Sequence, residues 1–148
     1  MPVDVRVETT IGVPRRRVAA FAGDPSNAPR WYSNIKSVVW VTAPPIALGS
    51  RMTFVAHFLG RRLEYTYEIV ELVPGEKLVM RTAQGPFPME TTYTWEERGA
   101  STLMTLRNRG EPSGFSKWMA PLMSMAMRRA TTQDLARLKA VLEETESK

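Results

Sequence analysis

The sequence predicts a single α+β domain in which a curved, seven-stranded antiparallel sheet wraps around a long C-terminal helix, with two short helices after the first strand. The central part of the chain has apolar residues at every second position, in segments joined by short turn signals, which is typical of an antiparallel meander. The C-terminal part spaces its apolar residues three and four apart, as one face of a helix does. Because the apolar face of the sheet needs a cover, we expect this helix to pack across it.

The N-terminal part predicts one strand and two short helical segments. Residues 3–7 alternate valines with charged side chains, which indicates a half-buried strand. A helix is expected over residues 14–22, since Pro14 suits a first helical turn and Gly23 follows the last apolar residue. Residues 26–37 contain Trp31 and fit either a second short helix or a turn-rich connector.

Six further strands are expected between the short helices and the C-terminal helix. The alternation is clearest from Leu63 to Ile69, where apolar residues at odd positions alternate with polar ones. Turn signals such as Pro74-Gly75 and Gly99 separate the segments, so neighbouring strands are expected to pair antiparallel. The six predicted strands cover residues 38–42, 51–58, 63–69, 77–83, 89–96 and 101–109.

The C-terminal helix is predicted over residues 116–144, a stretch without glycine or an internal turn signal. Pro121 lies near its start and marks either the true first turn or a kink. The helix is rich in methionine, a flexible side chain that adapts to irregular apolar shapes. These methionines suit an adaptable lid over a pocket and, equally, ordinary helix packing; they are Met119, Met123, Met125 and Met127.

Several classes of site are excluded by composition and spacing. The chain of 148 residues has no cysteine, which excludes disulfides and thiolate chemistry. Its one histidine, His57, falls on the outer face of a predicted strand without carboxylate partners, so neither a metal site nor a catalytic triad is expected. No glycine-rich phosphate loop, signal-peptide pattern or apolar run of about 20 residues is present. We therefore expect a cytoplasmic domain over residues 1–148 that needs no cofactor.

The net charge of the chain suggests one class of function, the binding of an anionic partner. A net charge of +5 fits an anionic partner such as nucleic acid or a membrane surface. The basic residues are scattered, however, and the aromatic residues needed to stack bases fall on inward faces instead. We therefore rank this function last and expect no nucleic acid partner and no stable membrane insertion. The arginines that would have to converge are Arg15, Arg16, Arg17, Arg61, Arg62, Arg128 and Arg129.

Several short sequence motifs, taken in their order and spacing, resemble those of the SRPBCC superfamily. These helix-grip proteins include START domains, the birch pollen allergen group and polyketide cyclases, and the resemblance is to the bacterial polyketide cyclase/dehydrase-like branch. It covers nearly the whole chain. The motifs are Ile11-Gly12-Val13-Pro14 running into Val18 and Phe21; Asp24-Pro25 followed by Trp31; Gly49 opening a strand; Tyr67-Glu68-Ile69-Val70-Glu71 ahead of Pro74; Ala120-Pro121-Leu122-Met123 with Arg128-Arg129; and Leu135-Ala136-Arg137-Leu138-Lys139.

The resemblance implies a deep cavity between the concave face of the sheet and the long helix. Members of the superfamily use this cavity for lipids, sterols, polyketides and plant hormones, and some are enzymes. The first hypothesis is therefore a domain that binds a small hydrophobic ligand, either a lipid, a polyketide or an aromatic. The alternative is an enzyme of the polyketide aromatase/cyclase type, in which tyrosine hydroxyls or ordered water assist proton transfer and a confined pocket orients the substrate.

The alternation of the strands and the helical spacing assign the candidate ligand-binding residues. The inward set is large and aromatic, and it either fills a solid core or lines a cavity. Candidate polar groups that orient a ligand are Tyr65, Tyr67, Thr82, Thr91, Tyr93 and Asn108. Glu71 falls on the inward register near a strand end, but a place at the solvated rim suits it better. The predicted ligand-binding residues are Trp31, Phe54, Phe58, Tyr65, Tyr67, Met80, Tyr93, Trp95, Met104, Met119, Leu122 and Met123.

Overall fold

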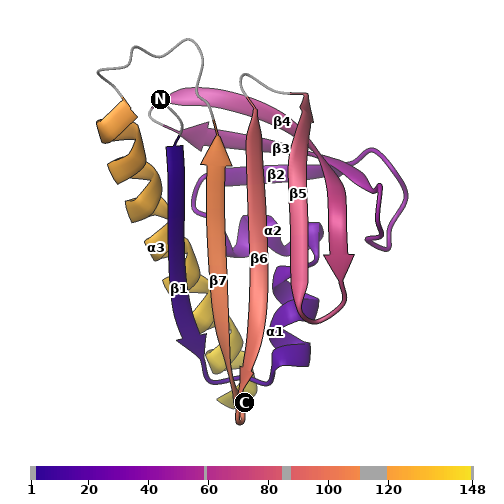
Figure 1. Ribbon diagram of the computed structural model, residues 1–148, viewed down its shortest axis with the longest axis vertical. Helices are drawn as coiled ribbons and strands as arrows, with labels where there is room; N and C mark the ends of the chain where they lie inside the picture. Colours follow the sequence, from indigo (N-terminus) through magenta and orange to yellow (C-terminus); the bar gives the residue numbers. More distant parts are fainter. Residues whose placement is uncertain (1–2, 59, 85–87, 111–119, 148) are drawn as a thin grey trace.

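The computed structural model describes residues 3–58, 60–84, 88–110 and 120–147, and within them the predicted fold is confirmed (Figure 1). A seven-stranded antiparallel sheet packs against a long C-terminal helix, and short helices follow the first strand. The elements are β1 (Val3–Ile11), α1 (Arg15–Ala22), the 3-10 helix η1 (Pro25–Asn27), α2 (Ala28–Trp31), β2 (Ile35–Trp40), β3 (Arg51–Phe58), β4 (Arg61–Val73), β5 (Lys77–Gln84), β6 (Met89–Arg98), β7 (Ser101–Gly110) and α3 (Ala120–Ser147).

The strands follow the order β1-β7-β6-β5-β4-β3-β2. Strands β2 to β7 form a meander, in which each strand pairs with the next one along the chain. The first strand joins the far end of this meander, with Val3 opposite Gly110 and Ile11 opposite Thr102 on β7. The segment of α1, η1 and α2 therefore carries the chain from one edge of the sheet to the other.

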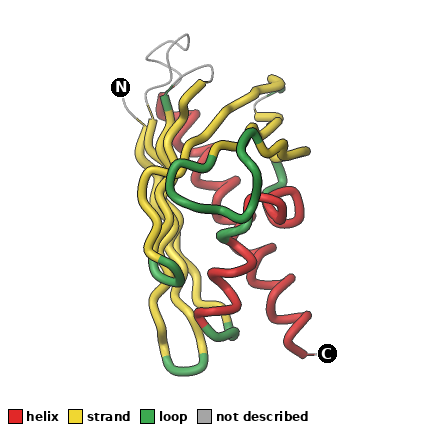
Figure 2. Tube along the Cα trace, turned by 90° about the vertical axis from the view of Figure 1, so that its right-hand side faces the viewer, coloured by secondary structure: helices red, strands yellow, loops and turns green. Residues whose placement is uncertain are grey.

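The helices all lie on one side of the sheet, and α3 runs obliquely across its concave face (Figure 2). Two basic side chains of α3 fasten it to the edge strand β1. Arg128 Nη1 donates to the backbone oxygen of Arg6 at 3.2 Å, and Lys139 Nζ donates to that of Thr10 at 2.8 Å. An edge strand presents backbone carbonyl oxygens that no neighbouring strand pairs. These contacts therefore hold α3 against β1 and also satisfy two of those oxygens.

The predicted faces of the strands agree with the burial of their side chains. On β4, the side chains of Leu63, Tyr65, Tyr67 and Ile69 are buried, and Glu64 is exposed. The inner faces of β1, β6 and β7 and one side of α3 complete the apolar core. The sequence pattern therefore placed the concave face correctly along the long strands.

Two local features differ from the sequence prediction. Strand β2 spans residues 35–40 rather than 38–42, and a register shift between Ile35 and Ser37 obscures the alternation there. A second bulge lies in β4, where Ile69 faces Met80 but Glu71 faces Val79 on β5. The extra residue reverses the faces beyond it, so Glu71 is exposed and its Oε2 lies 3.2 Å from Lys77 Nζ. The inward register is therefore not the one that Glu71 adopts, and its exposure agrees with the favoured place at the solvated rim.

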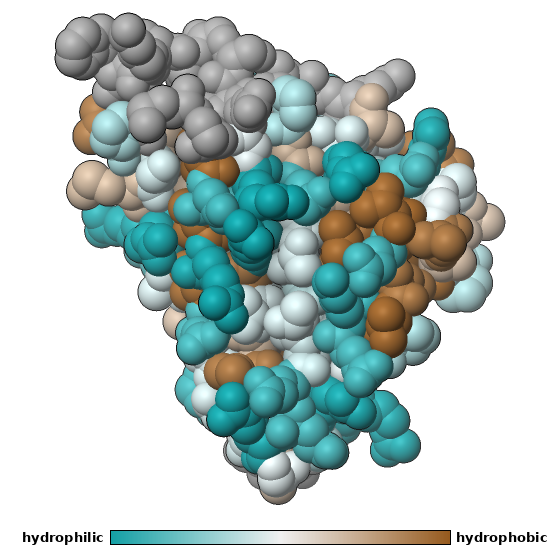
Figure 3. All heavy atoms as spheres, in the orientation of Figure 1, coloured by the Kyte–Doolittle hydropathy of each residue, from teal (hydrophilic) through white to brown (hydrophobic). Residues whose placement is uncertain are grey.

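The convex face of the sheet is polar over much of its area (Figure 3). Its charges are largely paired across strands: Glu90 lies between Arg81 and Arg109, and Asp4 accepts two hydrogen bonds from Arg107. Apolar residues gather toward the side of β3 and β4 in the same view. Among the helices that the structure describes, none is both long enough and apolar enough to cross a membrane.

Candidate ligand-binding site

A cavity of about 140 Å³ lies between the concave face of the sheet and α3. Strands β3 to β7 form one wall, α3 forms the opposite wall, and the segment after α2 closes one side. Half of the eighteen lining residues are apolar, and the rings of four tyrosines add to the apolar surface of the wall. Its apolar residues are Ile35, Phe54, Ala56, Leu63, Met80, Met89, Met123, Met127 and Ala130; its polar residues are Tyr32, Asn34, Tyr65, Tyr67, Thr91, Tyr93, Asn108, Thr131 and Asp134.

Six of the twelve predicted ligand-binding residues line this cavity. They come from four strands and from α3, and they meet because each strand turns alternate side chains toward the helix. Thr91 and Asn108, which we expected to orient a ligand, also line it. Thr82 instead exchanges hydrogen bonds with the backbone of Met89. The six residues are Phe54, Tyr65, Tyr67, Met80, Tyr93 and Met123.

Four predicted residues lie elsewhere. Trp31, Trp95 and Met104 are buried but do not line the cavity. Leu122 is 58% exposed, because one residue along a helix turns the side chain by about 100° away from Met123. Met119 and the side chain of Phe58 lie outside the described part of the chain.

A pair of tyrosine hydroxyls forms the polar centre of the cavity. Tyr32, which follows α2, and Tyr93 on β6 place their hydroxyl oxygens 2.5 Å apart. The ring of Trp31 packs behind them, with centroids 4.1 Å from Tyr32 and 5.8 Å from Tyr93. Burial raises the pKa of both tyrosines above the ordinary value, so both hydroxyls stay protonated. One hydroxyl donates to the other, and one proton remains available to a ligand.

Asp134 brings a buried carboxyl group to the cavity wall. Its side chain projects from α3 and the residue is only 2% exposed. Oδ1 accepts hydrogen bonds from Ser33 N at 2.9 Å and from Ser33 Oγ at 3.0 Å. Burial raises the pKa of Asp134, while the two bonds from Ser33 and the charge of Arg137 act in the opposite direction. Oδ2 accepts no hydrogen bond from the described residues, so it is available to a ligand.

A second polar group lies on the sheet side. Thr91 Oγ1 donates to Asn108 Oδ1 at 2.7 Å, across the pairing of β6 and β7. Tyr67 on β4 also lines this part of the wall. Burial raises the pKa of Tyr67 to about 12, and a hydrogen bond with Thr91 opposes this rise. The cavity therefore offers hydroxyl and amide groups for orienting a ligand.

Sequence reasoning missed Asp134 and Tyr32. A signal was present for Asp134, since Met123, Met127, Ala130 and Asp134 follow the three- and four-residue spacing of one helical face. The prediction from that spacing covers only the apolar residues of the face, so it does not include the carboxyl group. For Tyr32 no comparable signal exists, because the segment after α2 has no regular period.

The described residues contain no group of three or more histidine, cysteine, aspartate or glutamate side chains arranged to hold a metal ion. The chemistry that the cavity offers is therefore that of hydroxyl, amide and carboxyl groups in an apolar surrounding. Such groups orient a ligand by hydrogen bonding, and a carboxyl group with a raised pKa also transfers protons.

Comparison with known proteins agrees with this architecture. The family model described as polyketide cyclase / dehydrase and lipid transport matches residues 2–143. Among solved structures, a protein from Thermus thermophilus is 21% identical, with a TM-score of 0.81 over 93% of this chain and 94% of its own. A START superfamily protein from Mycobacterium smegmatis is 14% identical, with a TM-score of 0.83 over 96% of this chain and 98% of its own.

A third similar structure is the Zhui aromatase/cyclase from Streptomyces sp. R1128. It is 13% identical, with a TM-score of 0.79 over 97% of this chain and 94% of its own. At these identities the structural likeness shows the fold alone. No protein with curated annotation matches the sequence significantly.

Proposed function

We propose that this chain, which belongs to the polyketide cyclase / dehydrase and lipid transport family, holds a small hydrophobic molecule in the cavity between its sheet and α3. The observation that carries the proposal is the cavity itself. Its wall is mostly apolar, and a few buried polar groups, among them Tyr93 and Asp134, face the same space. A binding pocket for a small molecule combines these two properties.

The size of the cavity sets the scale of the ligand. Its 140 Å³ is close to the roughly 150 Å³ of an engineered apolar cavity that binds benzene. It is smaller than the roughly 300 Å³ at which drug-sized pockets begin. The described conformation therefore admits about one aromatic ring. Four methionines in the wall allow it to adapt to larger molecules, since their side chains are flexible; they are Met80, Met89, Met123 and Met127.

Native mass spectrometry of the purified protein, followed by denaturing extraction, tests this function directly. We expect a co-purifying apolar molecule, or saturable binding of a ring-sized apolar probe. The variant Ala130→Leu fills part of the cavity and should weaken binding, whereas Ala136→Leu on the exposed side of α3 should not. A protein that carries no ligand and binds no apolar probe would contradict the proposal.

A second candidate function is an enzyme of the polyketide aromatase/cyclase type. The observation that favours it is the carboxyl group of Asp134 in the same cavity as the hydroxyl pair of Tyr32 and Tyr93. A buried acid and a hydroxyl that both reach a bound molecule suit proton transfer during ring closure and dehydration. The likeness to an aromatase/cyclase in fold supports the same reading.

Turnover of a linear polyketide chain would distinguish the enzyme from a carrier. For an enzyme, Asp134→Asn should reduce kcat by about 100-fold or more, the usual contribution of general acid–base catalysis. Tyr93→Phe should reduce it less, because the hydroxyl of Tyr32 remains. Equal turnover by the wild type and both variants would argue against a catalytic role and leave the binding function standing.

A further inference from the structure

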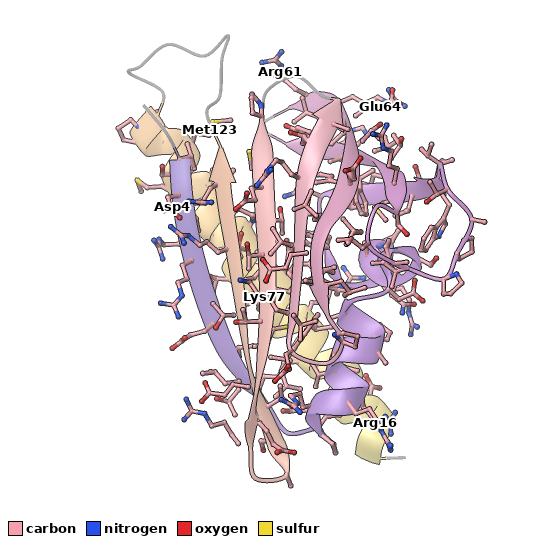
Figure 4. All side chains as sticks on the ribbon, turned by 45° about the vertical axis from the view of Figure 1, so that its right-hand side comes forward. Asp4, Arg16, Arg61, Glu64, Lys77 and Met123 are labelled. Atoms are coloured by element: carbon pink, nitrogen blue, oxygen red, sulfur yellow. The ribbon has the colours of Figure 1, made fainter. Side chains whose placement is uncertain are left out.

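The described cavity wall carries an acidic side chain and no basic one. Among the described residues that line it, Asp134 is the one acidic side chain, and there is no lysine, arginine or histidine. The charge of Arg61 acts on Tyr65 and that of Arg137 acts on Asp134, but neither arginine lines the cavity. Figure 4 shows Arg61, the first residue of β4, at the upper end of the molecule, while Met123 lies on α3. The described wall therefore supplies no positive group to pair with an anionic ligand.

The carboxyl group of Asp134 is held in a fixed orientation. Both hydrogen bonds from Ser33 end on Oδ1, one from the backbone and one from the hydroxyl. The remaining oxygen, Oδ2, belongs to a side chain that lines the cavity and has no hydrogen-bond donor among the described residues. An acceptor of this kind, nearly removed from solvent, binds a ligand's hydroxyl or amino group strongly when it is ionised.

The same carboxyl group penalises a negatively charged ligand. An ionised carboxylic acid placed in this cavity would lose its hydration and meet a like charge, and no cation in the described wall would compensate. An uncharged ligand that carries a donor avoids both costs. It also gives a donor to Oδ2, which accepts no hydrogen bond from the described residues.

We infer that the cavity selects ligands that carry a hydrogen-bond donor and no negative charge, with Asp134 Oδ2 as the acceptor, and that it rejects ionised carboxylic acids. This inference rests on the proposed binding function and narrows it: hydroxylated rings are accepted, and free fatty acids or aromatic acids in their ionised form are not. Specificity of this type depends on the unfavourable interactions with the rejected ligand as much as on the favourable ones with the accepted ligand.

The test compares three rings that differ in one substituent: toluene, phenol and benzoate. Protein labelled with 13C at the methionine methyl groups is titrated at pH 8. The methyl groups of Met80, Met89, Met123 and Met127 report on the cavity, and Met125, which is 68% exposed, serves as the internal control. We expect toluene and phenol to shift the cavity methyl groups. Benzoate should shift none of them at concentrations at which toluene saturates.

The variant Asp134→Asn removes the charge and retains an acceptor for Ser33. We expect it to weaken phenol binding by about ten-fold or more, to change toluene binding by less than about two-fold, and to admit benzoate. The variant Tyr93→Phe removes a neighbouring hydroxyl but no charge, so it should still reject benzoate. The comparison of the three ligands on the wild type remains decisive even where a variant does not fold.

The outcomes separate this inference from the proposed function. Absence of any shift with either neutral ring, toluene or phenol, would overturn the binding function itself. Toluene binding combined with equally tight benzoate binding in the wild type would overturn the inference alone. A phenol affinity that is the same in the wild type and in Asp134→Asn would likewise show that Oδ2 is not the acceptor.

Discussion

The hydroxyl oxygens of Tyr32 and Tyr93 lie 2.5 Å apart in the cavity wall, although 61 positions separate the two residues in the chain. Tyr32 directly follows α2 in the segment that joins β1 to β2, and Tyr93 belongs to β6, the third strand from the β1 edge. The contact therefore joins the segment after α2 to an inner strand of the sheet. It also determines which hydroxyl groups a ligand meets.

Removal of either hydroxyl should destabilise the protein by about 1–2 kcal/mol, because the partner is left buried without its hydrogen bond. The variants are Tyr32→Phe and Tyr93→Phe, and the measurement is the free energy of unfolding from urea titration. The double variant leaves no unpaired hydroxyl. Its cost should be smaller than the sum of the two single costs. Strict additivity would mean that the two hydroxyls do not interact.

Asp134 should make the protein less stable as the pH rises. Burial raises its pKa in the folded state above 3.8, so its contribution is fully present below that value and is lost as the pH passes through the raised pKa. The groups that interact with it are Ser33, through hydrogen bonds, and Arg137, Tyr32 and Tyr93, through charge. Asp134→Asn should therefore gain stability relative to the wild type at pH 7 and show less gain at pH 3. A difference that does not change with pH would contradict this.

Glu90 should show the opposite dependence. Hydrogen bonds from Arg109 and Arg81 lower its pKa, so its contribution is present above its ordinary pKa and is lost as the pH falls through the lowered value. Glu90→Gln should cost about 0.5–1 kcal/mol at pH 7, in the range of ion pairs near the surface. The cost should shrink in 1 M salt and should be lost as the pH falls through the lowered pKa. Glu96→Gln on the same strand, whose side chain is far more exposed, is the matched control.

The contact between Lys139 and β1 should contribute to stability and to protection of the edge strand. Lys139→Ala removes the bond to the Thr10 oxygen and the pairing with Glu143, and it should cost about 1 kcal/mol. Hydrogen exchange of the β1 amides should become faster. Arg129→Ala, on an exposed part of α3, should change the free energy of unfolding by less than about 0.5 kcal/mol. Equal effects of the two variants would argue against a specific role for Lys139.

The fold was predictable because its signals are periodic. Alternation from Leu63 to Ile69 and helical spacing along residues 120–142 each depend on many residues, so one irregular position does not obscure them. The bulge after Ile69 was not predictable, since an extra residue changes no composition and leaves the alternation intact on either side. The early start of β2 was hidden for the same reason.

The site was predictable only in part. The pattern shows which side chains face inward, but it does not separate those that fill the core from those that line the cavity. Met104 and Met80 share the inner face, but of these two only Met80 lines the cavity. Asp134 was not predicted, because the burial of a carboxyl group depends on a residue that hydrogen-bonds to it. That partner, Ser33, lies 101 positions away and carries no motif.

Ser33 and Asp134 tie the segment after α2 to the C-terminal helix through a single oxygen atom. If the other oxygen of that carboxyl group binds the ligand, one side chain serves both anchorage and recognition. Substitutions of Asp134 that stabilise the fold would then weaken ligand binding. Substitutions that improve ligand binding would weaken the contact with Ser33. Adaptation of the protein to a new ligand would begin at this trade-off.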